Sequence, residues 1–171
     1  NGISLSGHSS DVTIMENTIH GLLRDEVGMS AIKIDSDPKK NIILLANNIQ
    51  LGGSKLKIID AYNTSTTKFE ANKYFSDGEP DLWFSIDGSD EDFNSWVELT
   101  GDISSTIGRD EFADPPRSFE SYLSSVGASS SIDTFIELVV SQSRSGWRKD
   151  LTAEAISSYI RDGYGGQKCS Q

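Results

Sequence analysis

The chain has 171 residues, a formal net charge of −11 and a sequence pI near 4.5. Nucleic acids and anionic membranes bind basic protein surfaces, so this composition argues against both partners. No apolar run approaches the length of a membrane span, and the one cysteine, Cys169, excludes an internal disulfide.

The first predicted strands carry a pattern that returns along the chain. Residues 12–19 read apolar-x-apolar-x-x-Asn-x-apolar, and the pattern returns at 42–49 and 67–74. Its asparagines, Asn17, Asn47 and Asn72, are separated by 30 and 25 residues, a period typical of stacked repeat units. Asparagine tolerates the left-handed backbone that bends a strand, and its amide can bond an identical amide one repeat away. We therefore expect an asparagine ladder.

A second short strand is predicted upstream of each copy, at 3–5, 32–34 and 56–58, and a further one at 82–84. The outward residues of this series are Ser4, Lys33, Lys57 and Trp83. A fourth repeat at 93–99 has the strand pattern but carries Leu99 where the asparagine would fall, so the ladder should end there. The inward residues of all strands predict an interior of Val12, Ile14, Ile19, Ile34, Ile42, Leu44, Ile49, Ile58, Phe69 and Phe84.

This order of strand, turn, strand, asparagine corner and strand resembles the right-handed parallel β-helix of pectate lyases and related secreted bacterial proteins. The resemblance implies an all-β solenoid of about three to four rungs over residues 1–102. Its first rung would expose an apolar face, so we expect it to be covered by a missing amino-terminal segment or by another chain. None of the family's catalytic motifs can be matched, so catalytic residues are expected outside this fragment.

Residues 103–171 are predicted to form a loop and a small α-helical carboxy-terminal extension that packs on the solenoid. Helical spacing and capping residues predict helices at 118–123, 131–143, with Ser130 as its cap, and 152–161. The motifs of this tail include Arg117-Ser118-Phe119, Gln142-Ser143-Arg144 and Tyr159-Ile160-Arg161-Asp162-Gly163-Tyr164. Through them, residues 112–166 resemble the carboxy-terminal extension of predicted β-helix proteins of environmental bacteria. The aromatic residues expected to pack it onto the solenoid are Phe135, Trp147, Tyr159 and Tyr164.

Lys33, Lys57 and Trp83 are the candidate substrate-binding residues. If they stack about 4.8 Å apart, the lysines can neutralise successive uronate or sulfate groups, while the indole stacks on a sugar ring. Under the alternative interpretation, the lysines protect exposed strands from edge pairing and Trp83 packs under the tail. The substrate-binding hypothesis therefore requires Trp83 to be exposed.

Three carboxylates, Asp87, Asp90 and Asp92, form a candidate calcium site because Ca²⁺ prefers hard oxygen ligands. Their spacing differs from that of an EF-hand loop, and a solvated acidic loop is the alternative. The only histidines, His8 and His20, have no partner motif that would make them an acid–base pair.

Together these features predict the carboxy-terminal part of a secreted or cell-surface protein that acts on a polysaccharide. The predicted activity is that of a lyase or hydrolase with an anionic polysaccharide as substrate. The alternative is a non-catalytic extracellular β-helix that binds glycan or builds a surface assembly. The observation that separates them is a cleft with clustered basic and acidic side chains, as opposed to a flat groove.

Overall fold

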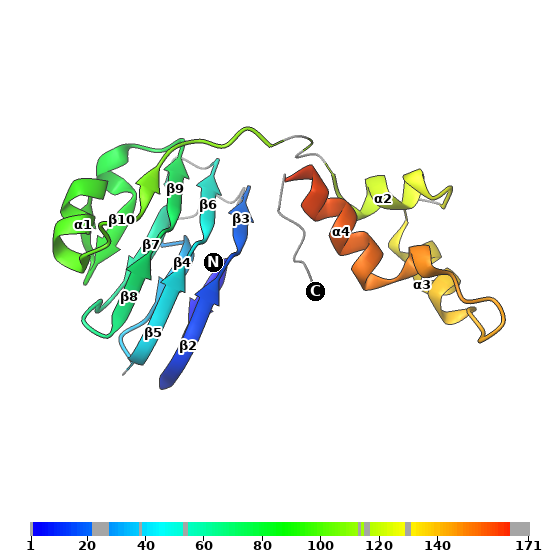
Figure 1. Cartoon of the computed structure of the whole chain (residues 1–171), viewed down its shortest axis with the longest axis horizontal. Coiled ribbons are helices and arrows are strands. Elements are labelled where there is room, and N and C mark those ends of the chain that lie inside the picture. The colour runs from blue at the N-terminus through cyan, green and yellow to red at the C-terminus, as the bar shows by residue number, and fades with distance from the viewer. Residues whose placement is uncertain are drawn as a thin grey trace. The chain divides into compact units, whose positions relative to one another are not determined.

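The computed structural model describes residues 2–21, 28–37, 39–52, 55–112, 114, 117–128 and 131–164 (Figure 1). The chain divides into two compact units, Asn1–Asp110 and Glu111–Gln171. Cys169 and Ser130 lie outside the described residues.

Three sheets build the first unit, and successive repeats of the chain contribute one strand to each. Their strand orders are β1-β4-β7-β10-β11, β2-β5-β8 and β3-β6-β9-β12. Among the described strands, every pair is parallel except β10 with β11. We call β1–β3 the first level, β4–β6 the second and β7–β9 the third. The strands are β1 (Ile3–Leu5), β2 (Ser9–Met15), β3 (Thr18–His20), β4 (Ser30–Ile34), β5 (Lys39–Leu45), β6 (Asn48–Leu51), β7 (Lys57–Ala61), β8 (Thr67–Glu70), β9 (Lys73–Ser76), β10 (Phe84–Ile86), β11 (Ser89–Glu91) and β12 (Thr106–Ile107).

The predicted fold class, an all-β solenoid, is wrong for this chain, which is mixed α and β. Its described residues form four α-helices as well as three mostly parallel sheets. The strand topology of the first unit remains compatible with a β-helix-like arrangement. The helices are α1 (Phe93–Thr100), α2 (Phe119–Ser125), α3 (Ile132–Val140) and α4 (Ala153–Gly163), with short 3₁₀ helices η1 (Pro80–Leu82) and η2 (Lys149–Leu151).

Helix α1 occupies the segment that was predicted as the fourth-repeat strand. The Asp92 carboxylate accepts a hydrogen bond from Ser95 N at 2.7 Å, which caps the helix, and Gly101 ends it with φ 74°. The apolar residues of the segment fit a helical spacing as well as a strand alternation. Trp96 is fully buried, stacking on Phe84 with ring centroids 4.7 Å apart. Tertiary packing of this indole therefore selects the helix.

The predicted interior of the first unit is confirmed. Eight of its ten residues are buried, and Val12 and Ile19 are half-buried against the same cluster. The second level is the most completely enclosed, because Ile34, Ile42 and Ile49 are each 1% exposed. Burial of these side chains is the main source of stability of the stack.

The asparagine ladder is confirmed. Asn17 Nδ2 donates to Asn47 Oδ1 at 3.0 Å, and Asn47 Nδ2 donates to Asn72 Oδ1 at 3.0 Å. The same oxygens also accept the backbone N–H groups of Asn17 and Asn47, at 3.1 and 3.0 Å. The left-handed residue at each corner is the one before the asparagine, and these residues are Glu16 (φ 55°), Ala46 (φ 53°) and Ala71 (φ 53°).

The ladder ends on a buried carboxylate. Asn72 N donates to Ser105 Oγ at 2.9 Å, and Ser105 Oγ in turn donates to Asp102. The other oxygen of Asp102 accepts from Tyr74 Oη at 2.9 Å and from Trp96 Nε1 at 3.2 Å. Burial raises the pKa of the Asp102 carboxyl, and the hydrogen bonds from these three side chains oppose that shift.

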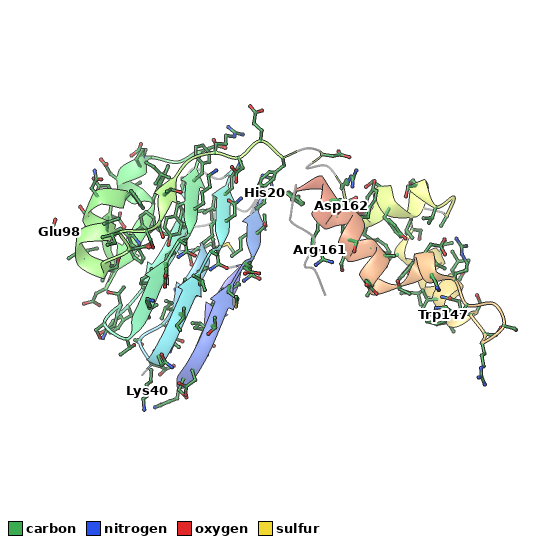
Figure 2. The ribbon with its side chains drawn as sticks, viewed as in Figure 1. His20, Lys40, Glu98, Trp147, Arg161 and Asp162 are labelled. Carbon is green, nitrogen blue, oxygen red and sulfur yellow. The ribbon has the colours of Figure 1, made fainter. Side chains whose placement is uncertain are left out.

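The second unit contains the three predicted helices, α2, α3 and α4. Ser118 caps α2 with reciprocal hydrogen bonds to Ser121, and Thr152 caps α4. Ring contacts join Tyr122 to Tyr159 at 5.2 Å and Phe119 to Phe135 at 4.9 Å. Figure 2 marks Arg161 and Asp162 on α4 and Trp147 in the connection after α3. Packing of this extension on the first unit stays a prediction.

Candidate functional site

The predicted lysine row is wrong because its register differs in the structure. Lys33 lies beside Ser4 on one side and Asp60 on the other, whereas Lys57 lies beside Ser30. The alternation of apolar and polar residues predicts that Ile58 points into the interior and Lys57 outward. In the structure, both Ile58 and the next residue, Ile59, are fully buried. Two adjacent isoleucines made the strand phase ambiguous, and strand pairing selects Ile59 as the partner of Ile32.

Both lysines have carboxylate partners. Lys33 Nζ lies 3.3 Å from Asp60 Oδ2, and Lys57 Nζ lies 2.5 Å from Asp90 Oδ1. These pairs reduce the positive potential that would attract an anionic polysaccharide. Trp83 is only 7% exposed, its Nε1 donates to Gly78 O at 3.1 Å, and its ring packs on Phe75. The structure therefore does not assemble Lys33, Lys57 and Trp83 into a sugar-binding face.

The three candidate calcium ligands have separate structural roles. Asp87, with φ 51°, lies in the turn between β10 and β11, and Asp90 pairs with Lys57. Asp92 caps α1, and the hydrogen bond from the Ser95 backbone lowers the pKa of its carboxyl. In the part of the chain that the structure describes, no group of three or more His, Cys, Asp or Glu side chains is placed to hold a metal ion.

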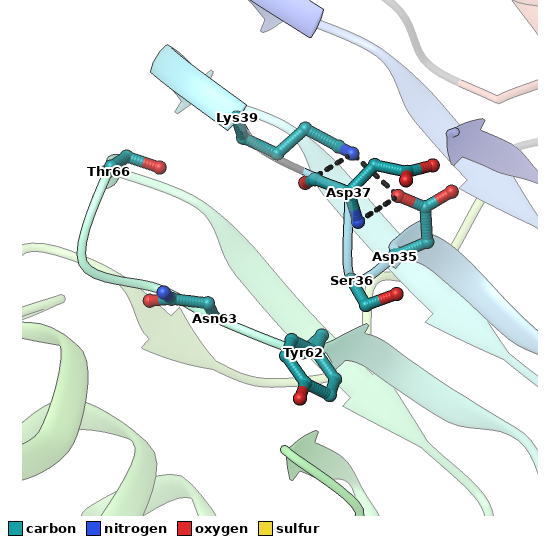
Figure 3. Close-up of a pocket in the computed structure, with 7 residues that line it drawn as sticks. All are labelled: Asp35, Ser36, Asp37, Lys39, Tyr62, Asn63 and Thr66. Carbon is teal, nitrogen blue, oxygen red and sulfur yellow. Dashed lines mark hydrogen bonds and ion pairs between the residues drawn. The ribbon is translucent and has the colours of Figure 1, made fainter. Parts of the chain in front are cut away.

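A polar pocket of about 270 Å³ lies between loops of the second and third levels (Figure 3). One wall comes from the connection between β4 and β5, and the other from the connection between β7 and β8. The lining residues are Asp35, Ser36, Asp37, Lys39, Tyr62, Asn63 and Thr66. This pocket is the candidate site, and its residues were not predicted as one.

Lys39 fixes the wall on the β4–β5 side. Its side chain is only 3% exposed, and its ammonium donates to Asp35 Oδ1 at 2.5 Å, Gly7 O at 2.7 Å and Asp37 O at 2.9 Å. The hydrogen bond from Lys39 is the main cause that lowers the pKa of the Asp35 carboxyl. Gly7 N closes the arrangement by donating to Asp37 Oδ2 at 2.9 Å. The first-level loop thus holds the second-level loop in place.

The opposite wall combines an aromatic ring with a closed turn. Tyr62 is 53% exposed, and its backbone N–H donates to Ile34 O at 2.9 Å, which fixes the start of the loop. Asn63 Oδ1 accepts from Ser65 N at 2.8 Å, the Asx turn typical of this residue. As Figure 3 shows, the Tyr62 ring and the Asp35–Asp37 loop border the same space. An accessible ring beside fixed polar groups suits a small polar ligand with one apolar face.

The two histidines belong to other parts of the first unit. His8 is exposed in the loop between β1 and β2, and His20 ends β3 (Figure 2). Burial and, to a smaller extent, the Arg109 charge lower the pKa of His20. Neither histidine lines the pocket.

Comparisons of the chain with protein-family models, curated proteins and solved structures find no match. The β-helix-like character of the first unit therefore comes from its strand topology alone. None of the helices in the described ranges combines the length and apolar character that crossing a bilayer requires.

Proposed function

We propose that the first unit binds a carbohydrate through the pocket beside Tyr62. The observation that carries this proposal is the exposed Tyr62 residue, which borders the same pocket as hydrogen-bonded carboxylate and amide groups and two hydroxyl groups, those of Ser36 and Thr66. Sugar rings present C–H faces that pack on aromatic rings, and hydroxyl edges that exchange hydrogen bonds with carboxylates and amides.

The charge of the pocket favours a neutral sugar over a uronate. Asp35 and Asp37 contribute two carboxylates, and the one ammonium, from Lys39, is already bonded to three oxygens. An anionic ligand would meet a local excess of negative charge on a chain of net charge −11. Carboxylates that accept hydrogen bonds from sugar hydroxyls carry no such penalty.

Binding is a better interpretation of this pocket than glycoside hydrolysis. A glycoside hydrolase needs a carboxylic acid that stays protonated near neutral pH, which requires a raised pKa. Asp35 has the opposite shift, because its hydrogen bond from Lys39 favours the ionised form. We therefore favour a non-catalytic glycan-binding role. The kinship with pectate-lyase-like β-helix proteins and the secreted or cell-surface location belong to the same proposal.

Replacing Tyr62 with alanine should weaken binding of a neutral β-glucan oligosaccharide about tenfold, which corresponds to about 1.4 kcal/mol. Tyr62→Phe should bind nearly as well as the parent chain, because it keeps the ring. Leu99→Ala on α1 removes an exposed apolar side chain away from the pocket and is the matched control. Isothermal titration calorimetry with each variant measures the affinities.

The same titrations test the charge argument with a polygalacturonate oligomer, which should bind more weakly than the neutral glucan. If Tyr62→Ala binds the glucan as tightly as the parent, this pocket is not the binding site. Appearance of unsaturated-product absorbance with polygalacturonate would instead support the predicted lyase.

A further inference from the structure

The two ends of the three-sheet stack differ. At one end, β11 pairs with β10, β12 pairs with β9, and Trp96 of α1 packs on Phe69 of β8 at 4.8 Å. At the other end, β1, β2 and β3 are each the terminal strand of a sheet. Figure 1 shows α1 beyond β8 and β10, on the side away from β2 and β3. Within the described residues of the first unit, one end is covered and the other presents three strand edges.

Burial of the interior falls toward the open end. Ile32 and Ile34 of the second level are 0% and 1% exposed, whereas Ile3 and Leu5 at the paired positions of the first level are only half-buried. Val12 and Ile19 of the first level pair with Ile42 and Ile49 of the second. They too are only half-buried, whereas their second-level partners are fully buried.

All hydrogen bonds between the ladder asparagines run in one direction, and the asparagine at the open end, Asn17, has an acceptor oxygen that receives none of them. In both ladder steps, the asparagine of the earlier level donates through its backbone N–H and its Nδ2, and the next asparagine accepts both at Oδ1. Asn17 Oδ1 is the corresponding acceptor of the first level. It has the geometry to receive two N–H groups from a corner one level further out.

Two of the three edges also lack the usual protection against pairing. Proteins block exposed edge strands with charged residues, proline or bulges, but β1 and β3 carry only apolar, hydroxyl and histidine side chains. In β2, Asp11 has φ 56° and interrupts the pairing with β5. An open strand edge favours an extended partner, because another strand can pair with its alternating N–H and C=O groups along the whole edge.

We propose that this end is a docking surface for one further level of parallel β-strands from another polypeptide segment. The docked segment supplies three short strands that pair with β1, β2 and β3, apolar side chains over Ile3, Val12 and Ile19, and a corner amide that donates to Asn17 Oδ1. A second copy docked in the same direction is excluded, because its opposite end is covered by α1, β11 and β12. A copy in the reverse direction would oppose two Asn17 acceptors.

The chain itself provides the test segment. Ile59, Ile32 and Ile3 are in register, so residue 57 is equivalent to residue 1. A second copy of residues 28–56 fused directly before residue 1 would therefore set its Ile32 over Ile3 and its Asn47 over Asn17. In the control fusion, the copied Ile32, Ile42 and Ile49 are replaced by proline, which prevents strand pairing.

The fused level should slow hydrogen exchange of the outer-edge amides of β1–β3 about tenfold or more relative to the control fusion, and should raise the urea midpoint. Changing the copied Asn47 to alanine should remove part of that gain. Equal exchange in the two fusions would overturn the proposal. So would sedimentation of the parent chain as a concentration-dependent dimer with these amides protected, because the occupant would then be a second copy.

Discussion

Replacing Asn47 with alanine should lower the free energy of unfolding of the first unit by about 3 kcal/mol. The Asn47 side chain is 1% exposed and takes part in four hydrogen bonds: it accepts two from Asn17 and donates to Asn72 Oδ1 and to Ile14 O at 2.9 Å. Alanine would remove the acceptor of the Asn17 backbone N–H and one donor each from Ile14 O and Asn72 Oδ1, and unmet buried polar groups cost more than the bonds themselves contribute. Urea unfolding followed by circular dichroism measures the change.

Asn94→Ala is the matched control, because Asn94 is exposed in the first turn of α1. Its effect should stay within about 0.5 kcal/mol. Equal midpoints for Asn47→Ala and Asn94→Ala would mean that the ladder contributes nothing to stability.

Replacing Asp102 with alanine should cost about 3–5 kcal/mol, because three buried donors lose their acceptor and each unsatisfied group costs about 1–3 kcal/mol. Asp102 is fully buried and accepts hydrogen bonds from Tyr74, Trp96 and Ser105. Two of these donors belong to fully buried aromatic residues, so water cannot replace the carboxylate. Asp102→Asn keeps an acceptor and similar volume, and should cost clearly less.

The pH dependence of stability should differ between the parent chain and Asp102→Asn. Burial raises the pKa of Asp102 in the folded chain above its unfolded value. The stability that this group contributes is therefore fully present below the unfolded pKa and is lost as pH rises through the folded pKa. Asp102→Asn has no carboxyl at this position, so its unfolding free energy should fall less than that of the parent over the same rise. Parallel pH profiles would contradict the raised pKa.

The repeat period was the most reliable feature of the sequence. Asn17, Asn47 and Asn72 could be found because a ladder requires one residue type at one position in each repeat. The interior followed from the same alignment. The prediction of which residues point inward failed at Ile58 and Ile59. These two buried isoleucines are adjacent, so an alternation with period two fits the segment in either phase.

The predictions of an exposed Trp83 and of a strand at residues 93–99 were wrong for a different reason. Whether an indole is exposed depends on the side chains that cover it, and those of Trp83 include Phe75 from β9. Helix α1 likewise depends on the contact of Trp96 with Phe84, because the local pattern fits either structure. The pocket beside Tyr62 was missed because its two walls come from loops of successive repeats, and no local motif joins them.

Because the hydrogen bonds of the ladder all run in one direction, the side-chain amide dipoles of the ladder are aligned. The side-chain amides of Asn17, Asn47 and Asn72 are dipoles, and the N–H ends of the first two point along the stack toward the end that holds Asp102. Hydrogen bonds in such a row polarise one another, by about 10–30% per bond. A donor bound at Asn17 Oδ1 would strengthen both amide–amide bonds of this row, which stops at Asn72 because Asn72 Nδ2 donates to Leu44 O.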